Sequence, residues 1–279
     1  MMAERKVSGR DIFLSIVAVS IVVILSYMLV SFLVISVPPQ ETNRWLANWF
    51  LTTTYNWENK DWWSGSPEVV TSILWDYRGL DTVYETSVFF FAIIGGLMLV
   101  RSVKIDKGSL GIKGMSVISK TITKIILVAV PVVAASVALH GHLTPGGGFQ
   151  GGSIFAVSSL LAIIALGTGF LYGRGWTKMR LLGFRTLGLL IISITVTALF
   201  VVGFFSGVTA YIVQNQWKPW APIGMGYLAD LGVFGNILYS GSLIFLNLAE
   251  FLAVSAGLSL AFIIMALPRK KLVEGGDIE

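Results

Sequence analysis

Residues 140–152 read HGHLTPGGGFQGG and decide how the middle of the chain folds. The stretch holds both histidines of the chain, His140 and His142, and apolar segments flank it on either side. Pro145 cannot continue a helix and restricts the residue before it, so the preceding helix is expected to end by Thr144. The glycines let the chain reverse at once into the next apolar segment. They are Gly146, Gly147, Gly148, Gly151 and Gly152. The pattern predicts a Gly/Pro-rich turn between two helices.

The composition places those helices in a membrane. The chain has 279 residues, of which 55% are hydrophobic and 13% are charged, whereas a soluble domain carries about 25% charged residues. Its apolar runs are long and continuous, which favours membrane helices over the alternating strands of a barrel. The predicted fold is an all-α polytopic membrane protein. Because there is no cysteine, thiolate metal sites, iron–sulfur ligation and disulfides within this chain are excluded.

Six membrane-spanning helices are predicted, with the 140–152 turn between the third and the fourth. They lie near residues 11–37, 82–101, 118–139, 150–172, 183–206 and 238–267. The last apolar region is too long for one simple crossing, which indicates a break around GNILYSG (235–241) or a strong tilt.

The distribution of Lys and Arg predicts the orientation. With six spans, 16 of the 20 basic residues fall on one side of the membrane and 4 on the other. Basic residues favour the cytoplasmic side, so both termini are expected in the cytoplasm and the 140–152 turn on the outer side. Because the basic residues occupy the short segments where topology rules place them, the net charge of +5 does not indicate nucleic-acid binding.

Glu250 is the clearest ionisable residue inside a predicted span. Asn236, Ser240, Asn247 and Glu250 have spacings that would place them on one helix face. An acid in a membrane helix usually faces protein or water and carries function. We interpret Glu250 as a carboxylate that takes up a proton or Na⁺. The alternative is a structural carboxylate held by hydrogen bonds or by a basic partner in an adjoining subunit.

Asp81 and Glu85 form a second candidate near the outer end of the second span. Their spacing of four places them on one helix face, and two close carboxylates resist ionising together, so one of them can hold a proton. The alternative is that Thr82 and Glu85 form a helix-capping box. Asp76 and Arg78 are expected to pair nearby.

The two histidines have two possible roles. His140 and His142 are two residues apart, so on a helix they would point to different faces, and two ligands without nearby thiolates or clustered carboxylates make a poor metal site. An imidazole beside a loose backbone can transfer protons near neutral pH. The alternative is a tight turn whose histidines are satisfied by backbone groups. A phosphate-binding loop is excluded because residues 146–152 lack the GK[ST] ending.

The outer segment 38–81 is rich in tryptophan. It contains Trp45, Trp49, Trp57, Trp62, Trp63 and Trp75. Tryptophan prefers the headgroup level, and residues 43–52 are expected to form an interfacial helix. The segment is interpreted either as a membrane anchor or as a docking surface for a neighbouring subunit. The glycine-containing polar segment 102–117 indicates a module boundary.

Two stretches resemble known families. LHGHLTPGGGFQGG (139–152) resembles the signature of the MnhB (MrpB) subunits of multisubunit Na⁺/H⁺ antiporters, with a likeness over about 115–267. ILWDYRGLDTVYETSVFFFAIIGG (73–96) is similar to the C-terminal, MbhE-like part of the large MrpA subunit, with a likeness over about 12–101 and with Asp81 and Glu85 in matching positions.

The resemblance implies a fusion of two neighbouring antiporter-type subunits. Residues 1–107 would be a two-helix MbhE-like module, and residues 108–279 a four-helix MnhB-like module. The chain would hold no cofactor or metal and would catalyse no reaction itself. It would help to form the Na⁺ and H⁺ path beside other Mrp-like subunits in the lipid membrane.

The resemblance also implies a range of host complexes. Archaeal membrane-bound respiratory complexes use such modules to couple a ferredoxin-oxidising arm to ion pumping. A sulfane sulfur reductase complex is favoured, followed by a hydrogenase and then a stand-alone Mrp antiporter. Two alternatives stay open: a structural adaptor that moves no ion, and an intramembrane enzyme, which would need a fuller set of ligands or nucleophiles than two histidines.

Overall fold

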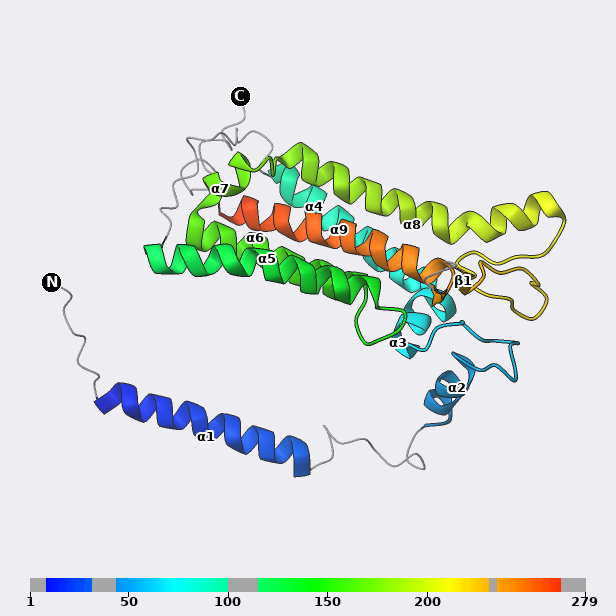
Figure 1. Cartoon of the computed structure of the whole chain (residues 1–279), viewed down its shortest axis with the longest axis horizontal. Coiled ribbons are helices and arrows are strands. Elements are labelled where there is room, and N and C mark those ends of the chain that lie inside the picture. The colour runs from blue at the N-terminus through cyan, green and yellow to red at the C-terminus, as the bar shows by residue number, and fades with distance from the viewer. Residues whose placement is uncertain (1–8, 32–43, 100–114, 231–234, 267–279) are drawn as a thin grey trace. The chain divides into compact units, whose positions relative to one another are not determined.

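The structure, a computed structural model, describes residues 9–31, 44–99, 115–230 and 235–266. The chain divides into two compact units, residues 1–49 and 50–279, and each is described by itself (Figure 1). The predicted module boundary at residues 107 and 108 lies outside the described residues.

The first unit contains one long helix, α1 (Gly9–Ser31). The helix carries the apolar segment Ser15–Ser31, whose large hydrophobic side chains are exposed on all sides. A helix that is apolar all round suits a lipid environment. The predicted first span, 11–37, continues past Ser31 into residues outside the described part. The helix α2 (Trp45–Thr53), expected from residues 43–52, crosses the boundary between the two units.

The second unit contains five helices that are long and apolar enough to cross a membrane. They are α4 (Gly79–Leu99), α5 (Val117–Leu139), α6 (Gly148–Leu166), α8 (Lys178–Ser206) and α9 (Ser242–Met265). Shorter elements connect them: α3 (Val69–Ser72), the π-helical turn η2 (Ile73–Tyr77), α7 (Thr168–Gly173), and the antiparallel strands β1 (Leu228–Asp230) and β2 (Asn236–Leu238). The prediction of an all-α polytopic membrane protein is therefore confirmed.

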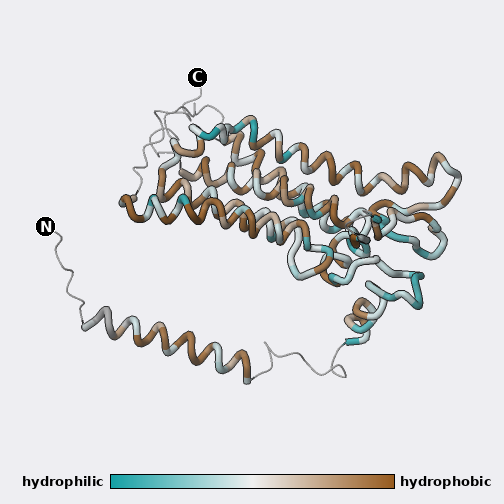
Figure 2. The backbone as a smooth tube through the Cα atoms, viewed as in Figure 1, coloured by the Kyte–Doolittle hydropathy of each residue, from teal (hydrophilic) through white to brown (hydrophobic). Residues whose placement is uncertain are grey.

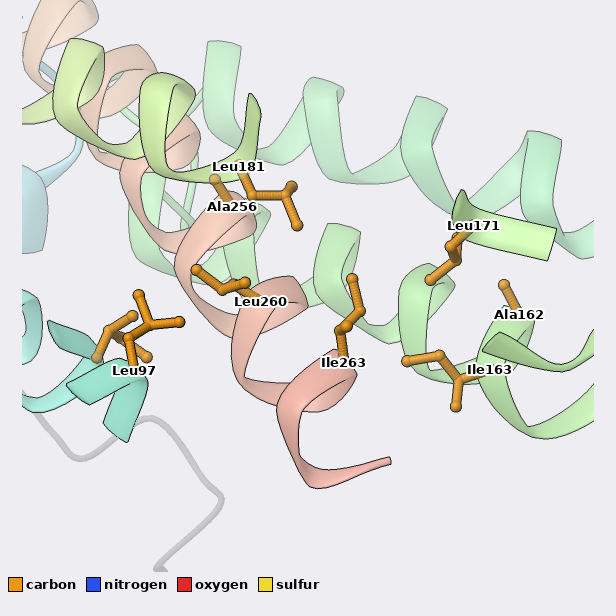
Figure 3. Close-up of a cluster of buried hydrophobic side chains, with 9 residues drawn as sticks. Leu97, Ala162, Ile163, Leu171, Leu181, Ala256, Leu260 and Ile263 are labelled. Carbon is orange, nitrogen blue, oxygen red and sulfur yellow. The ribbon is translucent and has the colours of Figure 1, made fainter. Parts of the chain in front are cut away.

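Helix α9 occupies the centre of this bundle and packs against α4, α5, α6 and α8 (Figure 1). Small residues allow the close approach: a Cβ placed on Gly188 of α8 would lie 2.9 Å from the backbone nitrogen of Ala253, and one on Gly152 of α6 would lie 2.8 Å from Cβ of Val254. Towards the C-terminal end of α9, Leu97, Ile163, Leu181, Leu260 and their neighbours form a buried apolar cluster (Figure 3).

Three of the predicted spans have wrong boundaries. The fifth was expected from residue 183, but α8 begins at Lys178. The fourth span was expected over 150–172, but α6 begins at Gly148 and ends at Leu166, because Gly167 has φ +91° and starts the separate helix α7. The sixth was expected from residue 238, but α9 begins at Ser242, after β2 and a turn in which Ser240 has φ +53° and Gly241 +64°. The break around GNILYSG is therefore confirmed.

Hydrophilic residues of the second unit concentrate at the α3 end of the bundle, where the helices give way to irregular connections (Figure 2). Polar side chains link three segments there: the Asn215 amide donates to the Ser64 carbonyl (2.8 Å), and the Ser242 hydroxyl donates to Oδ1 of Asn215 (2.9 Å). Trp63 and Trp75 are buried in this region, 3% and 1% exposed. Simple anchoring at the headgroup level is therefore wrong for these two tryptophans.

Candidate functional site

A cavity of about 190 Å³ lies at the α3 end of the bundle, between α4, η2, the start of α6 and the first half of α9. Its lining contains two acids and two side-chain amides from three helices. The lining residues are Thr71, Leu74, Trp75, Thr82, Glu85, Gly146, Gly147, Phe149, Gln150, Asn247 and Glu250.

Glu250 reaches this cavity from α9 and is 7% exposed. Its carboxylate accepts a hydrogen bond from the backbone N–H of Phe149, in the first turn of α6. Helix N-termini carry unpaired N–H groups and a partial positive charge. Gly147, the N-cap residue of α6, supplies no side-chain cap. Glu250 therefore takes the place of the missing cap from a neighbouring helix.

Two consecutive glycines, the last of the turn and the first of α6, make this contact possible. Gly147 has φ +141°, a conformation that residues with side chains rarely adopt. A Cβ on Gly148 would lie 2.6 Å from Cβ and 2.8 Å from Oε2 of Glu250, and it would also collide with the backbone oxygen of Asn247. A side chain at position 148 would therefore force α6 away from α9.

The other turn and packing residues are divided between the loop and the helix. Gly148, Gly151 and Gly152 belong to α6, so the turn itself ends at Gly147. A Cβ on Gly151 would lie 2.7 Å from the Ala134 carbonyl of α5. Gly146 lines the cavity, whereas Pro145 is exposed. The preceding helix α5 ends at Leu139, as the predicted span 118–139 has it, and the backbone N–H groups of residues 143 and 144 bond to the His140 carbonyl in the turn that follows.

Asn247 lies beside Glu250 and is 1% exposed. Within the described part of the chain its Nδ2 atom has no hydrogen-bond partner. Its oxygen lies 3.5 Å from the Cβ position of Gly147, at the cavity. Buried polar groups are normally paired, so this N–H donor is free to bind water or an acceptor atom of a ligand. Asn236 and Ser240 lie before α9 begins, so the expected four-residue stripe is reduced to Asn247 and Glu250.

Glu85 faces the same cavity from α4. Its carboxylate repels that of Glu250, and like charges at this range oppose simultaneous ionisation. The capping-box alternative for Glu85 is wrong: α4 begins at Gly79, and the Thr82 hydroxyl donates instead to the Leu74 carbonyl (2.6 Å).

Asp81 lies outside the cavity, although it shares a helix with Glu85. Its exposed carboxylate forms an ion pair with Arg78, through a hydrogen bond of 2.7 Å from Nε. The expected pairing of Asp76 with Arg78 is therefore wrong. Asp76 pairs instead with Lys218, Nζ to Oδ2 2.7 Å, and both side chains are buried.

Neither histidine lines the cavity. His140 is exposed and ends α5, with Nδ1 2.9 Å from the Ser136 carbonyl. His142 is buried, with Nε2 2.9 Å from the Leu238 carbonyl. Burial lowers the pKa of His142 below its usual range, which favours the neutral ring. Within the described segments, no three Asp, Glu or His residues come close enough to hold a metal ion.

Sequence reasoning missed two buried charged groups. One is the Asp76–Lys218 pair. The other is Arg185, which was not singled out, although it lies two turns inside α8 and is fully buried. Its guanidinium lies over the Phe89 ring, 4.5 Å from the centroid, and donates to the Ala253 carbonyl of α9 (3.2 Å). A predicted start at Lys178 instead of residue 183 would have placed Arg185 well inside the helix, where a charged residue needs a partner.

Comparison with known proteins identifies the family. Residues 118–260 match the family described as a domain related to the MnhB subunit of Na⁺/H⁺ antiporter. A probable A/B subunit of a K⁺/H⁺ antiporter from Rhizobium meliloti is 27% identical over 251 residues, 80% of this chain. The chain spans about a quarter of the length of that relative (24%). An uncharacterized protein of Methanocaldococcus jannaschii is 24% identical over 72% of this chain and 77% of its own length.

Two solved structures share the fold. One is a chain of the membrane-bound sulfane sulfur reductase, an archaeal respiratory membrane complex, with a TM-score of 0.53 and 21% identity over 92% of this chain and all of that one. The other belongs to the Mrp complex of Dietzia sp. DQ12-45-1b, with a TM-score of 0.54 and 19% identity over 95% of this chain and 27% of that one. The expected likeness over 115–267 is thus confirmed, and the chain belongs to the family of domains related to the MnhB subunit of Na⁺/H⁺ antiporters.

Proposed function

We propose that this chain is a non-catalytic membrane subunit of a multisubunit cation/proton antiporter module and that its cavity forms part of the ion path. The observation that carries the proposal is the meeting of Glu85 and Glu250, from different helices, in one cavity that the Asn247 side chain also lines. Acids and amides are the oxygen donors that hard cations bind. An acid inside a membrane helix is also costly unless it serves such a route.

The exchange step follows from charge. Two facing carboxylates are more stable when one of them binds a cation or a proton. In the proposed cycle, Glu250 binds a proton or Na⁺, and the facing Glu85 carboxylate adds a second negative charge that stabilises the bound ion. The Asn247 oxygen completes the coordination of Na⁺. The backbone N–H of Phe149 orients the Glu250 carboxylate without neutralising it.

The fusion of two modules, the orientation in the membrane, the neighbouring subunits and the host complex are also part of this proposal. A fusion between the C-terminal module of a large antiporter protein and an MnhB-type module is supported by the A/B name of the Rhizobium relative and by a match that covers 80% of this chain. We propose cytoplasmic termini, other Mrp-like subunits as neighbours, and a ferredoxin-oxidising arm in the host complex. Sulfane sulfur reductase is the favoured host, ahead of a hydrogenase and a stand-alone antiporter. Co-purification from native membranes and identification of the neighbouring subunits tests the proposed neighbours and host complex.

Transport by acid-to-amide variants tests the ion path. Glu250→Gln keeps an oxygen that can accept from Phe149 but cannot exchange a cation, and Glu85→Gln removes the facing charge. Asp81→Asn is the matched control, because Asp81 lies on the same helix but outside the cavity. Na⁺-driven and K⁺-driven proton movement in everted vesicles should fall at least tenfold in the first two variants and stay unchanged in the control.

A structural adaptor is the second candidate, favoured by one observation: Glu250 caps α6. It predicts that Glu250→Gln and Glu85→Gln transport ions normally, and that Gly148→Ala disrupts assembly. Normal transport by both amide variants in a fully assembled complex would therefore rule out the ion path.

A further inference from the structure

Two apolar grooves lie at the opposite end of the bundle, around α7. The first, about 660 Å³, runs between α6, α8 and α9. The second, about 640 Å³, runs between α5, α6 and α7. Phe155, Arg174 and Trp176 line both grooves, so the two form a pair that shares one wall and one charged residue.

The shared wall is aromatic. The Phe155 and Trp176 rings stack with centroids 5.9 Å apart, and Phe251 meets Phe155 edge-on at 5.7 Å. Leu187 and Leu252 add aliphatic surface to the first groove. The walls are thus suited to hydrocarbon, and Trp176 stands near the end of the bundle, where tryptophan meets lipid headgroups.

The charged residues of both linings are all basic. Arg174 and Arg180 line the first groove, while Lys124 and Arg174 line the second. Arg180 is held in place by a hydrogen bond from Nη1 to the Gly175 carbonyl (3.2 Å). Arg174 and Arg180 are both exposed and belong to the segment that basic-residue sorting assigns to the cytoplasmic side. Among the residues that the structure describes, no acidic side chain lines either groove to neutralise them.

We propose that the paired grooves bind one anionic phospholipid. Its phosphate lies between Arg174 and Arg180, and one acyl chain occupies each groove on either side of the Phe155–Trp176 wall. Arginine binds phosphate oxygens in a bidentate manner, and basic pockets between membrane helices attract anionic headgroups. A hydrophobic helix of a neighbouring subunit would fill the grooves but would leave the two arginines without a counter-charge.

Lipid retention by the purified full-length chain tests this site. The protein is exchanged into vesicles of phosphatidylcholine with or without phosphatidylglycerol, re-extracted, and its bound lipid is measured by native mass spectrometry. Wild type should keep one phosphatidylglycerol per chain in preference to phosphatidylcholine. The Arg174→Gln/Arg180→Gln variant should lose that preference by about tenfold or more. Lys178→Gln is the control, because Lys178 is a basic residue of the same segment that lines neither groove.

A second variant covers the possibility that the double substitution impairs folding. Leu252→Trp keeps both arginines and fills the first groove, and it should likewise release the lipid while Lys178→Gln retains it. Equal retention of the two lipids by wild type, or unchanged retention in both groove variants, would overturn the proposal. Cross-links that place a neighbouring subunit's helix in the grooves would also overturn it.

Discussion

Two buried acids at the α3 end of the bundle have opposite surroundings. Asp76 is buried against Lys218, and its other oxygen accepts the backbone N–H of Asn215 (3.1 Å). Glu250 is buried without a basic partner among the described residues, and it faces a second acid, Glu85, across the cavity. A buried acid paired with a lysine stabilises the fold, and we propose that the acid without such a partner binds a mobile cation.

Breaking the Asp76–Lys218 pair should have the largest effect on stability. Lys218 also donates to the Trp63 carbonyl (2.8 Å), so the pair joins two loops. Lys218→Met leaves an uncompensated buried carboxylate, which costs about 3–5 kcal/mol. Burial already raises the pKa of Asp76, so this loss should be smaller at low pH, where the carboxylate takes up a proton. Thermal unfolding in detergent measures it.

The double variant Asp76→Asn/Lys218→Met sharpens this test. It removes both charges, so it should recover most of the stability that Lys218→Met loses. If Lys218→Met unfolds at the wild-type temperature, the Asp76–Lys218 pair does not stabilise the packing of the loops.

Gly148→Ala should have the next largest effect, because a methyl group there occupies the space in which α6 packs against α9. The added methyl group would overlap Glu250 and Asn247, and overpacking of this kind costs about 1–3 kcal/mol. Gly183→Ala is the matched control: Gly183 also lies in a membrane helix, but a Cβ there meets nothing within 4 Å. Thermal unfolding should separate the two variants clearly. Equal behaviour would contradict the close contact at Gly148.

The pH dependence at His142 should be the smallest effect. Its folded-state pKa is below the ordinary value because the ring is buried. The unfolded chain therefore binds the proton more readily, and the free energy of unfolding should fall as pH drops below about 6.5. His142→Gln keeps a donor for the Leu238 carbonyl and removes the titration. The melting temperatures of wild type and variant should diverge between neutral and mildly acidic pH, and parallel curves would count against a buried neutral ring.

The sequence predicted those parts of the fold that depend on local patterns. Apolar runs located the five helices of the second unit, and the Pro145 and glycine pattern located the reversal between α5 and α6. Gly167 and Gly241 shifted two boundaries, because their conformations interrupt runs that are apolar in composition. Hydrophobicity alone does not record such breaks.

The site was predictable only in part. Glu250 could be recognised as an acid inside a span, and Glu85 as an acid four residues after Asp81. Asp81 and Glu85 share a helix face, so which of them reaches the cavity depends on how far along α4 the cavity lies, and this is set by tertiary packing. Asp76 and Lys218 are 142 positions apart, so no local spacing could have paired them.

We propose above all that Glu250 exchanges a proton for a cation at the cavity. Infrared difference spectroscopy of the purified complex, recorded as Na⁺ is added, tests it most directly. Wild type and Asp81→Asn should lose the band of a protonated carboxyl group and release a proton, whereas Glu250→Gln should show neither change. An identical Na⁺-induced carboxyl signal in Glu250→Gln would contradict the account.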